Sequence, residues 1–186
     1  MRMTNTMTLQ FDYQGLRRII SGGQTGADQG GLEAGRKLGI ETGGLAPRGW
    51  KTCRGPNPLL AVYGLVCVAS DEYNVRTAAN IRESDATLVI ARDLASPGTI
   101  FTINECRRQK KPCHVVSLDS ETIAHTRPLI ENTAHFIIEH QVVVLNVAGN
   151  RDRGDSMVMF DATIFLLHQV GLVLKDDGLL NIGVIQ

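Results

Sequence analysis

The sequence of 186 residues has no excess charge, because nineteen lysines and arginines balance nineteen aspartates and glutamates. A nucleic-acid-binding protein usually carries a basic excess, so this balance argues against nucleic acid as a partner. The chain also lacks a run of about 18 apolar residues, the length that crosses a bilayer. Its first ten residues are polar and lack the apolar core of a signal peptide. These absences predict a cytoplasmic protein without a membrane partner.

Cysteine and histidine are scarce and scattered along the chain. The four cysteines are Cys53, Cys67, Cys106 and Cys113, and they show no CxxC spacing. Such spacing favours reduced thiols over a disulfide or a zinc set. Among the five histidines, His135 and His140 are five residues apart and would not share a helix face. The sequence therefore predicts no metal site.

Apolar strand-like runs alternate with helix-like segments. The predicted strands are 16–20, 42–46, 86–91, 113–118 and 141–147. The predicted helices are 27–38, 74–83, 97–110, 123–139 and 156–170. The strand runs are continuously apolar and helices separate them, which predicts an α/β fold: a mostly parallel sheet covered by helices on both faces. Ligands of such sheets bind beyond the carboxyl ends of the strands.

We expect one ligand-binding domain over residues 16–175, between a flexible leader (1–15) and a C-terminal tail (176–186). The apolar stretch 179–185 is either an edge strand or a subunit contact. Residues 59–68 are apolar and ambiguous between helix and strand.

Residues 47–58 contain three prolines and two glycines, which predicts an irregular loop. Long ordered loops are often functional. Its single tryptophan, Trp50, either stacks on a flat ligand ring or pins the loop to the core.

The first candidate site is the glycine turn, residues 21–26, which joins the first strand to the first helix. Glycines permit positive φ and close backbone approach, and free N–H groups at a helix start suit a phosphate or another anion. Asp28 either caps this helix or binds a ligand amine or hydroxyl. The alternative is a tight turn without a ligand. The candidate residues here are Gly22, Gly23, Gln24, Thr25, Gly26 and Asp28.

A second helix start follows the strand at 86–91 and reads Ser96-Pro97-Gly98-Thr99. Free N–H groups again meet hydroxyl groups there, although simple N-capping by Ser96 would also explain the pattern. Because both helix starts lie at neighbouring strand ends, we expect Ser96, Gly98 and Thr99 to share one phosphate site with the glycine turn.

Two further segments supply candidates. Arg76 and Asn80 are four residues apart on a predicted helix face, where the arginine could bind a phosphate in a bidentate manner. A solvated helix face followed by an ordinary turn is the alternative. The last strand is followed by a segment that supplies an amide and a cation, or forms only a polar loop. The added candidates are Thr77, Ser84, Asp85, Asn146 and Arg151.

These motifs together resemble the family of molybdenum cofactor carrier proteins, a circularly permuted branch of the Rossmann-like SLOG superfamily that includes the Lonely-Guy phosphoribohydrolases. The resemblance runs in order over most of residues 17–170. The chain departs from the family pattern at Asn150, where the family has proline. The motifs that carry it are 21–30, 47–52, Arg76-Thr77 with Asn80, 84–89, 96–99 and 145–149.

The resemblance implies a Rossmann-like three-layer fold, a homo-oligomer (dimer or tetramer) and binding of the molybdenum cofactor as cargo. That cofactor is a phosphorylated pterin whose dithiolene holds the metal. A carrier would store and protect it without chemical change, and molybdoenzymes would be its partners.

Two alternatives remain: a nucleoside-monophosphate N-glycosidase and a nucleotide-sensing module. The related hydrolases carry a catalytic glutamate at the position where this chain has Thr102, and threonine is no acid or base near neutral pH. Glu105, one turn further on, would lie too deep to replace it. We therefore expect Thr102 to line a binding pocket, and we favour a binding protein over an enzyme.

Overall fold

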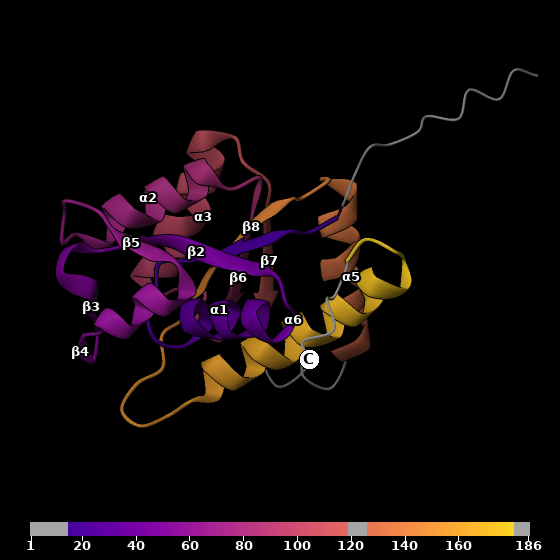
Figure 1. Cartoon of the computed structure of the whole chain (residues 1–186). Coiled ribbons are helices and arrows are strands. Elements are labelled where there is room, and N and C mark those ends of the chain that lie inside the picture. Colours follow the sequence, from indigo (N-terminus) through magenta and orange to yellow (C-terminus); the bar gives the residue numbers. More distant parts are fainter. Residues whose placement is uncertain (1–14, 119–125, 181–186) are drawn as a thin grey trace, which may run out of the picture.

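A parallel sheet of six strands forms the middle layer of the molecule (Figure 1). The computed structural model describes residues 15–118 and 126–180. The strands lie in the order β5-β2-β1-β8-β6-β7, and all their pairings are parallel. This confirms the predicted α/β fold. The strands are β1 (Arg18–Ile20), β2 (Glu41–Ala46), β5 (Leu65–Cys67), β6 (Ala86–Ala91), β7 (Cys113–Ser117) and β8 (Val144–Gly149).

Helices cover both faces of the sheet (Figure 1). On one face, α6 (Val158–Asp176) packs between α1 (Ala27–Lys37) and α5 (Thr126–Glu139). On the other face, α2 (Tyr73–Glu83) packs against α3 (Pro97–Gln109). The predicted three-layer arrangement is therefore confirmed.

Strand β8, the last in the described part of the chain, lies in the centre of the sheet. It pairs with β1 on one side, where Leu145 lies opposite Ile19, and with β6 on the other, where Val147 lies opposite Leu88. All four side chains are fully buried. The chain proceeds outward from β1 to β5 on one side of β8, and from β6 to β7 on the other. This reversal opens a crevice at the carboxyl ends of β8 and β6, where ligands of such sheets bind.

The main hydrophobic core lies between the sheet and the layer of helices that contains α6. Leu167 and Leu174 of α6 are fully buried in it. By length and composition alone, α6 could cross a membrane, since its mean hydropathy reaches 1.5. Its contacts with α1 and α5 make it the central core helix of this layer.

Two segments have more regular structure than the sequence suggested. The ambiguous stretch 59–68 contains all but the first residue of a 3-10 helix, η2 (Pro58–Tyr63), and then β5. The predicted irregular loop 47–58 contains a short 3-10 helix, η1 (Arg48–Trp50), and a small hairpin. The hairpin pairs β3 (Lys51–Thr52) with β4 (Gly55–Pro56).

The hairpin forms because Thr52 closes its tip. The Thr52 hydroxyl donates to the carbonyl of Gly55 at 2.6 Å and accepts from the Arg54 N–H at 3.1 Å. Trp50 packs against a small cluster that includes Leu60. It therefore pins this segment to the core, as one of the two interpretations expected.

Some boundaries differ from the expected ones. Strand β8 continues to residue 149 and α6 continues to residue 176, so the predicted ends at 147 and 170 were wrong. Leu180 is buried against the core, which extends the packed domain into the expected C-terminal tail. Nearly all of the expected leader, the helix start at 123–125 and residues 181–186 lie outside the described residues.

Candidate functional site

A cavity of about 790 Å³ opens at the carboxyl edge of the sheet. Its walls come from the glycine turn, α2, the loop between β6 and α3, and the segment after β8. These are the segments that the sequence predicted to converge. The predicted residues that line it are Gln24, Asp28, Arg76, Thr77, Ser96, Gly98, Thr99, Thr102 and Arg151.

The glycine turn uses its own N–H groups inside the protein. The Gly23 N–H donates to the Ser21 hydroxyl at 3.2 Å, and the Gln24 N–H donates to the Asp28 carboxylate at 3.2 Å. The Thr25 N–H donates to the Gln24 side chain at 3.0 Å. The expectation that this turn cradles a phosphate is therefore wrong for these donors. The Asp28 carboxylate already fills the place of an anion.

Asp28 forms a buried ion pair with Arg76. Arg76 Nη1 lies 3.0 Å from Asp28 Oδ2, and the two residues are only 7% and 3% exposed. Burial raises the pKa of Asp28, while the Arg76 cation and the Gln24 N–H partly offset that rise. Arg76 Nε is buried and has no hydrogen-bond partner among the described residues. The pair forms part of the cavity wall.

Two glycines of the turn permit close packing around this pair. A Cβ at Gly22 would lie 1.4 Å from Arg76 Nη1, so only glycine leaves room for the guanidinium. A Cβ at Gly26, which has a φ of 81°, would lie 2.5 Å from the carbonyl oxygen of Asn150. These two glycines thus permit close packing of the turn against Arg76 and against the backbone of Asn150.

The start of α3 differs, because it faces the cavity with donors to spare. The N–H groups of Gly98 and Thr99 belong to the first turn, where helix N–H groups lack intrahelical acceptors. A Cβ at Gly98 would meet no atom within 4 Å, so there is open space beside it. The Thr102 hydroxyl donates to the Gly98 carbonyl at 2.9 Å. This helix start therefore presents free N–H donors, of the kind that suit an anion, to the cavity.

Asn150, directly after β8, holds the loop before α3 in place. Its side-chain oxygen accepts from the N–H groups of Arg92 and Asp93 at 2.9 and 2.7 Å. Its amide nitrogen lies 3.1 Å from the Ser96 hydroxyl and 3.0 Å from the Thr99 hydroxyl. The ends of β8 and β6 are thereby joined at the cavity.

Eight predicted site residues do not line the cavity. Four belong to the glycine turn (Gly22, Gly23, Thr25 and Gly26), and the other four are Asn80, Ser84, Asp85 and Asn146. The Ser84 hydroxyl donates to the Ile81 carbonyl, and Asp85 accepts from the N–H groups that begin β8, so both lie at the amino edge of the sheet. Asn80 binds the backbone of β2, and Asn146 donates to a threonine of β6 inside the sheet. None of them lines the cavity. Their polar groups serve the fold, because buried polar atoms require partners.

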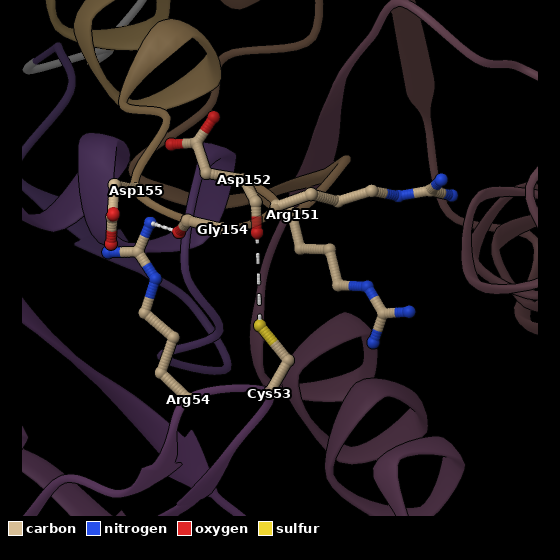
Figure 2. A pocket seen from close by; sticks show the side chains of 7 residues that line it. Cys53, Arg54, Arg151, Asp152, Gly154 and Asp155 are labelled. Atoms are coloured by element: carbon tan, nitrogen blue, oxygen red, sulfur yellow. Dashed lines mark hydrogen bonds between the residues drawn. The ribbon is translucent and has the colours of Figure 1, made fainter.

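Thr25 links the glycine turn to the hairpin. Its hydroxyl lies 3.1 Å from the Cys53 sulfur, and Gln24 accepts from the Cys53 N–H at 2.9 Å. A second cavity of about 450 Å³ lies here. Figure 2 shows Arg54, one of its lining residues, reaching the carbonyl of Gly154. The residues that line this cavity are Cys53, Arg54 and 151–155.

Sequence reasoning missed several residues that line the main cavity. Arg92 and Asp93 directly follow the predicted strand at 86–91, so their position at its carboxyl end could have identified them. Tyr73 and Phe101 add aromatic wall, and no comparable signal in the sequence marks them. The missed residues are Tyr73, Asn74, Arg92, Asp93, Pro97, Phe101, Ala148, Gly149, Asn150, Asp152, Arg153, Ser156, Val158 and Met159.

Glu105 is bonded to residues of its own helix and is not positioned to act on a ligand in the cavity. It accepts from Arg108 at 2.6 Å and from Gln109 at 2.6 Å. The hydrogen bond from Arg108 lowers the pKa of Glu105 to about 2. The paired carboxylate does not line the cavity. It is therefore a poor substitute for the glutamate of the related hydrolases.

The cysteines are free thiols in the structure. Within residues 15–118 and 126–180, no group of three histidine, cysteine, aspartate or glutamate side chains could hold a metal ion.

Comparison with known proteins agrees with this geometry. The model of the circularly permuted YpsA SLOG family matches residues 19–170. A crystal structure from Syntrophus aciditrophicus SB, titled "Putative molybdenum carrier protein", shares 33% sequence identity with the chain. The match covers 84% of this chain and 96% of that one, with a TM-score of 0.71. No curated protein matches significantly. The chain thus belongs to the circularly permuted YpsA SLOG family and has its cofactor- or nucleotide-binding architecture.

Proposed function

We propose that the protein binds the terminal phosphate of the molybdenum cofactor at the start of α3 and stores that cofactor without changing it. The observation that carries this proposal is the helix start itself. Its N–H groups adjoin open space at Gly98 and border a cavity that, besides the ion-paired Arg76, holds three more arginines. Helix N-termini and arginines are the usual partners of phosphate. These arginines are Arg92, Arg151 and Arg153.

The rest of the cavity suits the remainder of such a ligand. A volume of about 790 Å³ lies within the range of small-molecule sites. Tyr73 and Phe101 offer aromatic surface to a flat pterin ring. Thr77 and Thr102 line the cavity and donate their hydroxyl hydrogens to helix carbonyls, so their oxygens are available to accept from the polar edge of that ring. The crystallised relative from Syntrophus aciditrophicus is named as a molybdenum carrier protein, which supports this choice of cargo.

The proposed carrier acts as a cytoplasmic homo-oligomer, a dimer or a tetramer, that passes its cargo to molybdoenzymes. An apolar stripe along α6 supports self-association. Its members Val158, Phe165 and Leu172 are seven residues apart and 50%, 54% and 40% exposed. Residues at this spacing lie on one face of a helix.

A retention experiment tests the cargo. The protein is mixed with isolated molybdenum cofactor, passed through gel filtration and assayed for bound molybdenum. We expect stoichiometric retention by the wild type and at least a tenfold loss with Gly98→Asp, because the new carboxylate enters open space at the phosphate site. Asn132→Asp is the matched control. It adds the same charge at an exposed position of α5 that does not line the cavity, and it should retain as much as wild type. Absence of retention by the wild type would rule out the carrier function.

Two alternative functions of the same cavity can also be tested: a nucleoside-monophosphate N-glycosidase and a nucleotide-sensing module. Thr102 stands where the related hydrolases have their catalytic glutamate. Asp28 is a carboxylate of the cavity wall that could take the role of that glutamate. We expect no release of free base when the protein is incubated with nucleoside monophosphates and the products are separated by chromatography. Release that Asp28→Asn abolishes would favour the hydrolase.

A further inference from the structure

The segment between β8 and α6 lines both cavities. Arg151, Asp152 and Arg153 belong to the walls of the main cavity and of the second one. The segment is therefore a wall that the two cavities share. Across the second cavity, the opposite wall is the tip of the hairpin, where Cys53 and Arg54 lie.

The base of this segment is fixed to the two neighbouring helices. The Asp152 carboxylate accepts from the N–H groups of Met159 and Phe160 at 2.8 and 3.1 Å. The carbonyl of Asn150 accepts from the first N–H of α1 at 3.1 Å. These bonds flank Arg151 on both sides, so its position does not depend on the hairpin arginine.

The tip of the segment, residues 153–156, is held from outside by Arg54. Arg54 Nη2 donates to the carbonyl oxygen of Gly154 at 2.5 Å and to that of Ser156 at 2.9 Å, and Figure 2 shows the first of these bonds. In the described part of the chain, the other hydrogen bonds of the tip are local: one closes a turn within it, and one joins Ser156 to Val158. Among the residues that the structure describes, Arg54 alone thus bonds the tip to a distant segment.

The position of Arg153 depends on these two bonds, because Arg153 begins the tip and lines the main cavity. Backbone that is not held samples many conformations, since ordering it costs conformational entropy. Without Arg54, fewer molecules would therefore hold Arg153 at the main cavity. The apparent affinity for a ligand falls in proportion to the fraction of molecules that are ready to bind it.

We propose that Arg54 is a positioning residue: it bonds the carbonyls of Gly154 and Ser156 and thereby holds Arg153 at the main cavity, where Arg153 binds an anionic oxygen of the ligand. Arg54 itself does not line that cavity. The inference rests on the proposed function, because it concerns the same phosphate site. It adds that a residue outside the cavity sets the anion affinity, and that it does so through Arg153 and not through Arg151.

A double-mutant cycle tests this coupling. The probe is inorganic phosphate at pH 8, titrated while the amide signals of Gly98 and Thr99 are followed by nuclear magnetic resonance. We expect Arg54→Ala to weaken binding about fivefold in the wild type and in the Arg151→Ala background, but less than about twofold in the Arg153→Ala background. Loss of the Arg54 charge alone would weaken binding by the same factor in every background.

The mobility of the tip is a second measurement, made without ligand. Amide relaxation should show lower order parameters at residues 153–156 in Arg54→Ala than in the wild type. Arg48→Ala is the matched control. It removes the same charge from η1, which lines neither cavity, and should leave the order parameters and the phosphate affinity unchanged.

The outcomes distinguish the two proposals. Equal losses in the Arg151→Ala and Arg153→Ala backgrounds, or unchanged order parameters at residues 153–156, would overturn the role of Arg54 and leave the phosphate site intact. No saturable shift of the Gly98 and Thr99 amides in the wild type would overturn the phosphate site and the inference with it. Thermal unfolding of each variant confirms that the compared proteins are folded.

Discussion

Replacing Asp28 with alanine is expected to lower the free energy of unfolding by about 3–5 kcal/mol. The change leaves the Arg76 guanidinium buried, at 7% exposure, without its carboxylate 3.0 Å away. It also removes the acceptor of the Gln24 N–H, so the glycine turn loses a constraint. Urea denaturation followed by circular dichroism measures the loss.

An exposed ion pair within α1, the helix that carries Asp28, is the matched control. Arg36 Nη2 lies 2.7 Å from Glu33 Oε1, but the Arg36 side chain is 63% exposed. Exposed pairs contribute about 0–1 kcal/mol, so Arg36→Ala should cost little. Equal losses for Asp28→Ala and Arg36→Ala would show that the buried pair is not a structural anchor.

The raised pKa of Asp28 adds a pH dependence. Because the pKa is higher in the folded than in the unfolded chain, protonation of Asp28 favours folding. That contribution is full below about pH 3.8, the ordinary value, and is lost as the pH rises through the raised pKa. The stability of wild type relative to Asp28→Asn should therefore fall as the pH rises above about 4. A difference that stays constant with pH, in parallel denaturation curves, would contradict this.

Gly149→Ala is the second change with a large expected effect. A Cβ at this position would lie 1.8 Å from the carbonyl oxygen of Ile90 in β6. That oxygen also accepts from the Asn150 N–H at 3.1 Å. The methyl group must separate β8 from β6 or displace Asn150. We expect a loss of about 3 kcal/mol or more in unfolding free energy.

Gly98→Ala provides the control for this substitution. A Cβ there meets no atom within 4 Å, and Gly98 is not among the glycines with positive φ. Replacement of glycine by alanine in a helix usually stabilises by up to about 1 kcal/mol. Chemical denaturation should show a clear loss for Gly149→Ala and none for Gly98→Ala. A Gly149→Ala protein as stable as wild type would show that the two strands can separate without cost.

The layers and most of the sheet could be predicted from sequence because continuous apolar runs leave few alternatives. The segment 86–91 is buried throughout in the structure, and its composition already indicated that. The central place of β8 was not predictable from the same pattern. Strand order depends on contacts between distant segments, such as Ile19 with Leu145, and local composition does not record those pairings.

The residues of the site likewise divide into those that local sequence could predict and those that it could not. Helix starts after strands are local features, so the position of residues 96–99 at the cavity was predictable. The internal hydrogen bonding of the glycine turn was not predictable. The Gln24 N–H donates to the Asp28 carboxylate, and that carboxylate is held by Arg76, which lies far along the chain. Ser84 and Asp85 could have been excluded from the sequence. They precede the predicted strand at 86–91, and in a parallel sheet this places them at the amino edge, opposite the edge where ligands bind.

The central position of β8 also bears on how the protein comes into being. Strands β1 and β6 share no pairing of their own and are joined only through residues 144–149. A chain emerging from the ribosome therefore carries two incomplete half-sheets until its final quarter has been made. Residues 148–153 are among those that line the cavity, so the cavity cannot form before this segment has been made.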